Sequence, residues 1–292
     1  MQPFGVWKIF RDVFAPLAFS KTLLHVSSIA LLVGLYSLLP VWKEASPLKD
    51  YGDIPSQIHA AMSLTLGWLL VFRTNSAYAR WWEARSLWGT LVNASRNLAI
   101  KLTCLAELTE SDSKFLQSRI SEFPSALMRH LRISPLADLD PRADGGSSNN
   151  DHQPVVIAHQ LYDWLARQKA SGRIDGDELR VIDVELAKLL EVCGACERIA
   201  RTPIARSYRV FARQCILLFL VTLPWGIISD FGWWTIPLSI ITAYFMIGME
   251  VVAEHVEEPF GLDEDDLDLE GLCKTIATSA NEIFTRKSDR RR

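Results

Sequence analysis

Two groups of residues in this sequence have types and spacings that suit metal or redox chemistry. The first is a C-x-x-C pair, Cys193 and Cys196, a pattern found in dithiol redox sites and in zinc sites. A zinc site of this kind needs a second pair or a nearby histidine, and the surrounding sequence supplies neither. The five cysteines are an odd number scattered along the chain, which does not indicate a disulfide framework. We therefore expect the pair to serve helix packing.

The second group is an acidic run near the C-terminus. It begins with Glu254, His255, Glu257 and Glu258 and continues through the segment GLDEDDLDLE. Carboxylate oxygens suit calcium, and a histidine among carboxylates suits the metal of a hydrolytic enzyme. However, only one histidine lies in the run, and no nucleophile or base accompanies it. We therefore expect no catalytic site, and a solvated acidic tail is the alternative to a calcium site.

Composition places the chain between soluble enzymes and compact membrane transporters. Of the 292 residues, 49% are hydrophobic and 22% are charged, and the mean hydropathy is +0.11. These values are typical of a protein with both membrane and water-soluble parts. A net charge of -3 gives no reason to expect a nucleic acid partner.

One long helix is predicted where an apolar run passes into a segment rich in Arg and Trp, at residues 67–89. Residues 54–72 contain no Asp, Glu, Lys or Arg, and a helix of this length nearly crosses a hydrocarbon core. Neither Pro nor Gly interrupts residues 77–87, so the helix should continue into water. Trp81 and Trp82 follow the apolar run, near the boundary where indole rings are favoured.

Three further apolar stretches, at residues 22–42, 214–229 and 231–249, are interpreted as membrane spans. Basic residues lie before the first span, after the second and before the third, whereas the turn near residue 230 has none. By the positive-inside rule, this pattern predicts four transmembrane helices with both termini in the cytosol. The expected fold is therefore an all-α membrane protein with a large cytosolic helical domain.

These spans divide the chain into five parts. We expect an interfacial N-terminal helix at 1–20, the first and second transmembrane helices at 21–82, a cytosolic helical domain at 83–206, the third and fourth transmembrane helices at 207–250 and an acidic cytosolic tail at 251–292.

Local signals predict the helices of the cytosolic domain. Asp175 and Glu178 have the spacing of a capping box, which indicates a helix that begins there and runs to about Arg201. Pro124 and Pro135 predict breaks in the helical region that begins at residue 107. The remaining expectations are a helix at 154–170, a turn at 172–176, a surface loop at 143–152 and a disordered RKSDRRR end.

Three motifs give the chain a resemblance to the bestrophin family, and in particular to its bacterial members. They are FRTNSAYARWWEARSLWG from Phe72, CERIARTPI from Cys196 and AEHVEEPFG from Ala253, in the order and spacing that the family shows. The resemblance covers nearly the whole chain. It implies a homopentamer of helical subunits around one ion pore in the bacterial inner membrane. The second transmembrane helices would line the pore, and the remaining helices would form a cytosolic vestibule.

The resemblance places the narrow neck of the pore on Leu64, Trp68 and Phe72. A spacing of four puts these residues on one slanting stripe of a helix, which an oligomer would stack as successive rings. Apolar rings gate by excluding water until the pore widens. Trp68 is larger than the aliphatic residue usual there in bacterial relatives, which suggests a closed resting neck. The alternative is that any apolar helix carries such a stripe.

The resemblance places a second constriction at the cytosolic exit, where relatives usually carry an aliphatic residue. The turn GRIDGDEL puts Asp177 at this position with Glu178 beside it, and Ile174 is the candidate if the alignment shifts. One carboxylate from each subunit around an exit would concentrate cations and repel anions. Alternatively, Asp175, Asp177 and Glu178 only cap a helix and complement its dipole.

The acidic run corresponds to the calcium clasp of animal bestrophins. The residues that map onto it are His255, Glu258, Asp263, Asp265 and Asp266, of which the first two stand where the clasp has amide side chains. Bacterial relatives are generally not calcium-gated. We therefore expect no cofactor, and calcium binding is the alternative.

Together these inferences predict a bestrophin-like ion channel selective for monovalent cations (Na⁺ or K⁺), because bacterial members pass such cations and Asp177 favours them. The alternatives are an anion channel of the same family and a non-conducting membrane scaffold. The expected partners are further copies of the chain, membrane lipid and permeating ions, but no nucleic acid.

Overall fold

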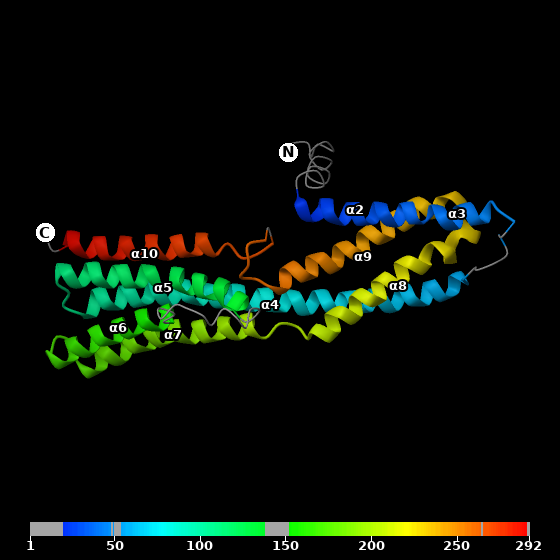
Figure 1. The fold of residues 1–292 in the computed structure, drawn as a ribbon. Helices are drawn as coiled ribbons and strands as arrows, with labels where there is room; N and C mark the ends of the chain where they lie inside the picture. Colours follow the sequence, from blue (N-terminus) through cyan, green and yellow to red (C-terminus); the bar gives the residue numbers. More distant parts are fainter. Residues whose placement is uncertain (1–19, 48, 50–53, 138–151, 264, 291–292) are drawn as a thin grey trace, which may run out of the picture. The chain divides into compact units, whose positions relative to one another are not determined.

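The structure, a computed structural model, describes residues 20–47, 49, 54–137, 152–263 and 265–290 (Figure 1). These residues form helices and no strand, in agreement with the predicted all-α fold. The elements are α2 (Lys21–Tyr36), α3 (Leu38–Glu44), α4 (Ser56–Leu105), α5 (Glu110–Ala137), α6 (Gln153–Ala170), α7 (Gly176–Arg201), α8 (Arg206–Phe231), the short 3-10 helix η1 (Gly232–Trp234), α9 (Thr235–Glu257) and α10 (Leu269–Arg290).

Two of the predicted elements lie mostly outside the described residues. These are the interfacial helix at 1–20 and the surface loop at 143–152.

The chain divides into two compact units, each with its own hydrophobic core. Unit 1 consists of Met1–Tyr78 and Ile204–Glu257, and unit 2 of Ala79–Pro203 and Glu258–Arg292. Helix α4 has 50 residues and contributes to both units without interruption, so the prediction of one long helix is confirmed. The first part of α4 belongs with α2, α3, α8 and α9, and its second part belongs with α5, α6, α7 and α10.

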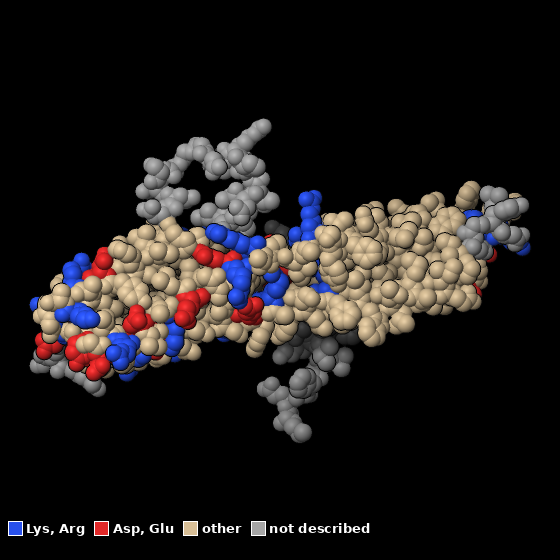
Figure 2. Space-filling model, turned by 90° about the horizontal axis from the view of Figure 1, so that it is seen from below, with Lys and Arg blue, Asp and Glu red and all other residues tan. Residues whose placement is uncertain are grey.

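Unit 1 contains the apolar helices. Two of its stretches, Thr22–Glu44 and Arg206–Glu257, are long and apolar enough to cross a membrane. The first part of α4 is not among them, because it also carries Gln57, His59 and several Ser and Thr. On the face that Figure 2 shows, Lys, Arg, Asp and Glu are nearly absent from the surface of unit 1 except towards its ends.

The first predicted span is interrupted at Ser37, between α2 and α3. Pro40 has no backbone N–H, so it cannot donate a hydrogen bond to the carbonyl of Tyr36. At the interruption itself, the Ser37 hydroxyl donates a hydrogen bond to the Gly34 carbonyl at 2.7 Å. At the other end of unit 1, α9 runs beyond the expected end of the fourth span at Met249 and reaches Glu257.

The predicted breaks at Pro124 and Pro135 are wrong, because α5 continues through both residues. A proline inside a helix removes one backbone hydrogen bond and can be tolerated when packing compensates. Here α5 packs against α6, α7 and α10, and Phe123 and Leu127 are fully buried. Tertiary contacts therefore override the local signal.

The prediction of a disordered C-terminal end is also wrong for residues 286–290, which belong to α10. This helix packs along α5 and inserts a row of apolar side chains into the core of unit 2. The row consists of Leu269, Cys273, Ile276, Ala280 and Phe284. These residues recur at helical spacing in the sequence. The many charged residues around them led instead to the prediction of a disordered end.

The start of α7 is as predicted. The Asp175 carboxylate accepts hydrogen bonds from the backbone N–H groups of Asp177 and Glu178, and Glu178 accepts one from the backbone of Asp175, which completes a capping box. Gly172 supplies the positive φ of 73° in the preceding turn. Further along α7, Cys193 and Cys196 are free thiols buried in the core.

Within unit 1, α4 and α8 approach each other closely at Gly226. A Cβ atom at this position would clash with the imidazole of His59, whose Nε2 lies 3.1 Å from the Thr222 hydroxyl oxygen. Small residues are common at such contacts between apolar helices, because they let the backbones come near.

We predict that Gly226→Ala lowers the thermal stability of the purified protein, because the added methyl group must displace a buried imidazole. Thermal unfolding in detergent measures the effect. Gly194→Ala in α7 is the matched control, since a Cβ there meets no atom within 4 Å. Replacing a helical Gly by Ala without a clash should be neutral or stabilise by roughly 0.5–1 kcal/mol. Equal midpoints for the two variants would contradict the proposed close packing.

Candidate functional site

The three residues predicted to form a pore neck lie on one open face of α4. Leu64, Trp68 and Phe72 expose 66%, 64% and 59% of their surface. The rings of Trp68 and Phe72 are 6.2 Å apart, so they form a continuous apolar ridge. On the opposite side of the same helix, Leu66 and Leu70 are buried in the core of unit 1.

A groove runs beside this ridge on α4. It is lined by Ala60, Ser63, Leu64, Gly67, Trp68 and Val71. Among the described residues, and apart from the chain neighbours of Gly67, a Cβ built at this position meets no atom within 4 Å. The described part of a single chain therefore leaves this face of α4 uncovered.

Other helices of unit 1 expose large apolar side chains as well. Leu32 of α2, Leu217 of α8 and Phe245 of α9 are as exposed as the neck residues. All these faces are available to lipid or to further copies of the chain, because apolar side chains suit both surroundings. Exposure alone therefore does not identify the α4 face, rather than a face of α2, α8 or α9, as the one that lines a pore.

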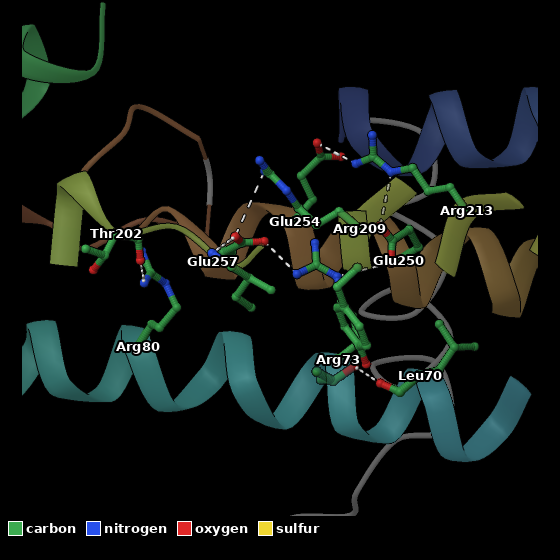
Figure 3. Close-up of polar contacts among 12 residues, drawn as sticks. Leu70, Arg73, Arg80, Thr202, Arg209, Arg213, Glu250, Glu254 and Glu257 are labelled. Atoms are coloured by element: carbon green, nitrogen blue, oxygen red, sulfur yellow. Dashed lines mark hydrogen bonds and ion pairs between the residues drawn. The ribbon is translucent and has the colours of Figure 1, made fainter. Parts of the chain in front are cut away.

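The residue that follows Phe72 has the opposite environment. Arg73 is completely buried, although an isolated charge in an apolar interior is very unfavourable. Its Nη1 lies 2.6 Å from Glu257 Oε2, and its Nε lies 3.4 Å from Glu250 Oε2. Both carboxylates come from α9 and are themselves buried (Figure 3). The guanidinium thus ties α4 to α9.

Helix α8 extends this network from the buried Arg73 towards the surface, where Arg213 and Glu254 are partly exposed. Arg213 binds Glu250 through Nε at 3.1 Å and Glu254 through Nη2 at 2.6 Å. Arg209 lies 4.0 Å from Glu257, whose Oε1 also accepts a hydrogen bond from the backbone N–H of Ile204. Three arginines therefore face three glutamates from three helices, and their charges balance (Figure 3).

The sequence alone did not predict this network. It assigned the arginines of α8 to the basic residues before the third span and assigned Glu254 and Glu257 to the acidic run. One signal was available: Glu250, Glu254 and Glu257 recur at a spacing of three and four, which places them on one face of a helix. Recognising that face required knowing that the helix extends past Met249. The partner Arg73 is 177 residues away from Glu250 in sequence and could not be paired from local pattern.

At the predicted exit constriction, the three candidates have different environments within unit 2. Asp177 is exposed, and Glu178 is partly exposed with its carboxylate engaged in the capping box. Ile174 is buried in the hydrophobic core of unit 2, so of the three candidates it is the least accessible to an ion. Asp177 has exposed Arg173 and Arg180 near it in sequence, which reduce the local negative charge.

The residues of the acidic run separate between the two units. His255 belongs to α9 of unit 1, whereas Glu258 and the aspartates belong to unit 2. In unit 2 the run folds into a turn, because the Asp266 carboxylate accepts a hydrogen bond from the backbone N–H of Asp263 at 2.6 Å. The Asp265 carbonyl accepts another from Trp81 Nε1 at 3.2 Å.

Among the described residues, the acidic run brings no three carboxylate or imidazole ligand atoms within 4.8 Å of one another. The four members that belong to unit 2, Glu258, Asp263, Asp265 and Asp266, therefore do not form a compact metal site by themselves. The described residues hold one such group elsewhere, in unit 2, which sequence reasoning did not identify. It consists of His130, His152 and Glu197.

Comparison with known proteins agrees with the predicted resemblance. The family model described as bacterial/fungal bestrophin protein matches residues 9–282. A voltage-dependent anion channel-forming protein of Nostoc sp. is 33% identical over 234 residues, which cover 76% of this chain and 75% of the relative. A protein of the same description from Synechocystis sp. is 33% identical over 241 residues, 80% and 78% of the two chains.

Solved structures share the fold. The crystal structure of a bacterial bestrophin homologue from Klebsiella pneumoniae has a TM-score of 0.77 at 24% identity and covers 88% of this chain and 97% of that one. A single-residue variant of the same homologue has a TM-score of 0.78 at 25% identity, with 88% and 98% covered. With the family model matching nearly the whole sequence, this chain belongs to the bacterial and fungal bestrophin family.

Proposed function

We propose that this chain forms a membrane ion channel in which the first part of α4 lines the pore. Membership of the bestrophin family carries the proposal, and the exposed apolar stripe of Leu64, Trp68 and Phe72 is the α4 face that the resemblance assigns to the pore neck. Relatives named channel-forming proteins and the bestrophin fold support the same reading. The pore would be a homopentamer in the bacterial inner membrane, with four spans per subunit and both termini in the cytosol.

In such an assembly the stripe would form stacked rings of apolar side chains. A narrow apolar ring excludes water, and a hydrated ion cannot enter until the ring widens. The indole of Trp68 is the largest of the three side chains and contacts the ring of Phe72. We therefore propose that these two residues hold the neck closed at rest.

The ion pairs of Arg73 with Glu250 and Glu257 would hold this neck in place. Arg73 directly follows Phe72, and a step of one residue turns a helix by about 100°, so the two side chains point in different directions. One faces the uncovered side, and the other binds α9. The ion pairs thereby determine the rotation of α4 at the level of Phe72.

For the permeating ion we propose a monovalent cation, on the strength of Asp177. Its carboxylate is exposed at the start of α7, where the N-terminus of the helix also favours a negative charge. Copies of this carboxylate around a common axis would attract cations and repel anions. The apolar neck does not discriminate between the signs of ions.

A chloride-type anion channel is the second candidate. The relatives from Nostoc and Synechocystis are both named voltage-dependent anion channel-forming proteins. Arg173 and Arg180 near Asp177 would also favour anions if their charges prevailed at the exit.

The reversal potential of the purified protein in planar bilayers under a KCl gradient distinguishes the two candidates. We predict a value near the potassium equilibrium potential, and a shift towards zero in Asp177→Asn, because the uncharged amide no longer repels anions. Asp163→Asn, an exposed carboxylate on α6, is the control and should leave the value unchanged. A wild-type value near the chloride equilibrium potential would establish the anion channel instead. Absence of current, even in Trp68→Ala, would favour a non-conducting scaffold.

We predict that Trp68→Ala increases the single-channel conductance or the open probability several-fold, because the smaller side chain widens and wets the neck. Bilayer recordings measure both quantities. Trp233→Ala is the matched control, since Trp233 in η1 is similarly exposed at 73% but lies off α4. Equal currents for Trp68→Ala and the wild type would show that this position does not limit conduction.

We predict that Arg73→Met lowers the free energy of unfolding by about 3–5 kcal/mol, because it leaves buried carboxylates without a counter-charge. Arg73→Lys should lose less stability. Thermal unfolding in detergent provides the measurement, and bilayer recording should show altered gating in the variant that still folds. The control Lys114→Met removes an exposed pair with Glu110, which is worth about 0–1 kcal/mol. Similar losses for Arg73→Met and Lys114→Met would rule out the anchoring role.

A further inference from the structure

Three side chains from separate elements of unit 2 converge on one point. His130 belongs to α5, His152 is the N-cap of α6, and Glu197 belongs to α7. Oε1 of Glu197 lies 2.5 Å from Nε2 of His152 and 2.8 Å from Nε2 of His130. The two imidazole rings are 4.1 Å apart. All three residues are partly buried, so the cluster is shielded but still reachable from solvent.

Two imidazoles and one carboxylate are a ligand set that zinc and similar ions prefer. We propose that His130, His152 and Glu197 bind one divalent transition metal ion of the Zn²⁺ class. This site is separate from the acidic run that the sequence suggested, and it departs from the expectation that the chain needs no cofactor.

The protonation states of His130 and Glu197 favour metal binding. Burial and the neighbouring His152 lower the pKa of His130, so at neutral pH this imidazole has a lone pair to donate. Burial alone would raise the pKa of Glu197, but hydrogen bonds and charge interactions with His152 and His130 outweigh burial and lower it. The carboxylate is therefore ionised, and a divalent ion would add a favourable charge interaction.

Metal binding would require only small shifts of the ligand atoms. Ligand atoms about 2.0–2.2 Å from a tetrahedral zinc ion lie roughly 3.3–3.5 Å from one another. Each imidazole nitrogen would therefore move away from the Glu197 oxygen by at most about 1 Å on metal binding. The ion would replace the hydrogen bond between His152 and Glu197 and the close contact of His130 with Glu197, and it would connect α5, α6 and α7.

One existing contact opposes binding. The Nδ1 of His152 accepts a hydrogen bond of 3.4 Å from the backbone N–H of Val155. When Nε2 binds a metal, the ring proton moves to Nδ1 and this capping bond is lost. The loss of one N-cap hydrogen bond is small beside the free energy with which proteins bind structural zinc. The positive charge of Arg201 near His130 adds a further small cost.

Cys193, one helical turn before Glu197 on α7, lies beside the cluster but is not one of the residues whose ligand atoms all lie within 4.8 Å of one another. Its Sγ lies 3.7 Å from Glu197 Oε1. Burial, followed by the charge of Glu197, raises the pKa of this thiol to about 12, so it is protonated without a metal. A bound cation would favour the thiolate. The fourth position would be filled by a water molecule, or by Cys193 if its side chain turns towards the ion, and Cys193→Ser distinguishes the two.

The test uses the full chain purified in detergent, stripped with a chelator and titrated with Zn²⁺. We expect one zinc ion per chain by elemental analysis after gel filtration, and a rise in the midpoint of thermal unfolding, because the ion binds only the folded state. His130→Ala and Glu197→Gln should each weaken binding at least tenfold. His159→Ala, a 73% exposed histidine on α6 that pairs with Asp163, is the matched control and should bind as the wild type does.

A second measurement covers the case in which a variant fails to fold. Co²⁺ added to the stripped wild-type protein should give the intense visible absorption of a tetrahedral site, and Zn²⁺ should displace it. Binding and thermal shift that persist in both His130→Ala and Glu197→Gln would overturn the proposal. So would a wild-type protein that shows neither the cobalt spectrum nor a zinc-dependent midpoint.

Discussion

Unit 1 depends on one buried guanidinium held between two carboxylates. Removing the charge of Arg73 from water costs several kcal/mol unless opposite charges surround it. Glu250 and Glu257 provide these charges from α9, and Arg209 and Arg213 of α8 balance them in turn. Apolar packing alone would tolerate small rotations of these helices. The ion pairs have directional geometry, so they select one register of α4 against α9.

Because the ion pairs of Arg73 hold α4 against α9, one face of α4 packs into the core and the other stays exposed. Leu66 and Leu70 pack into the core together with Arg73, while Leu64, Trp68 and Phe72 remain uncovered. In the proposed channel, the neck could widen by side-chain rotation of Trp68 and Phe72 without breaking any buried ion pair. A rotation of α4 itself would have to separate Arg73 from Glu257, which is unfavourable. In the proposed channel, gating by side chains, or by movement of α4 and α9 together, would therefore cost less free energy than rotation of α4 alone.

Unit 2 shows how packing between distant segments overrides local preference. Helix α10 covers α5 with a row of apolar residues, and α5 continues through two prolines because its neighbours hold it. The same convergence of α5, α6 and α7 places His130, His152 and Glu197 together. A metal ion at this junction would join three elements that otherwise meet mainly through apolar contacts, and it would make the stability of unit 2 depend on metal supply.

The sequence alone determined the features that depend on neighbouring residues. It predicted the all-α fold, the uninterrupted α4, the capping box at Asp175 and the family, because helical period, breakers and motifs are local signals. Tertiary structure decided the rest. Arg73 and Glu250 are 177 residues apart, and the sequence around Cys193 contains no histidine, although the fold brings His130 and His152 to Glu197 beside it. Such partners depend on how whole helices pack, and no local pattern encodes that packing.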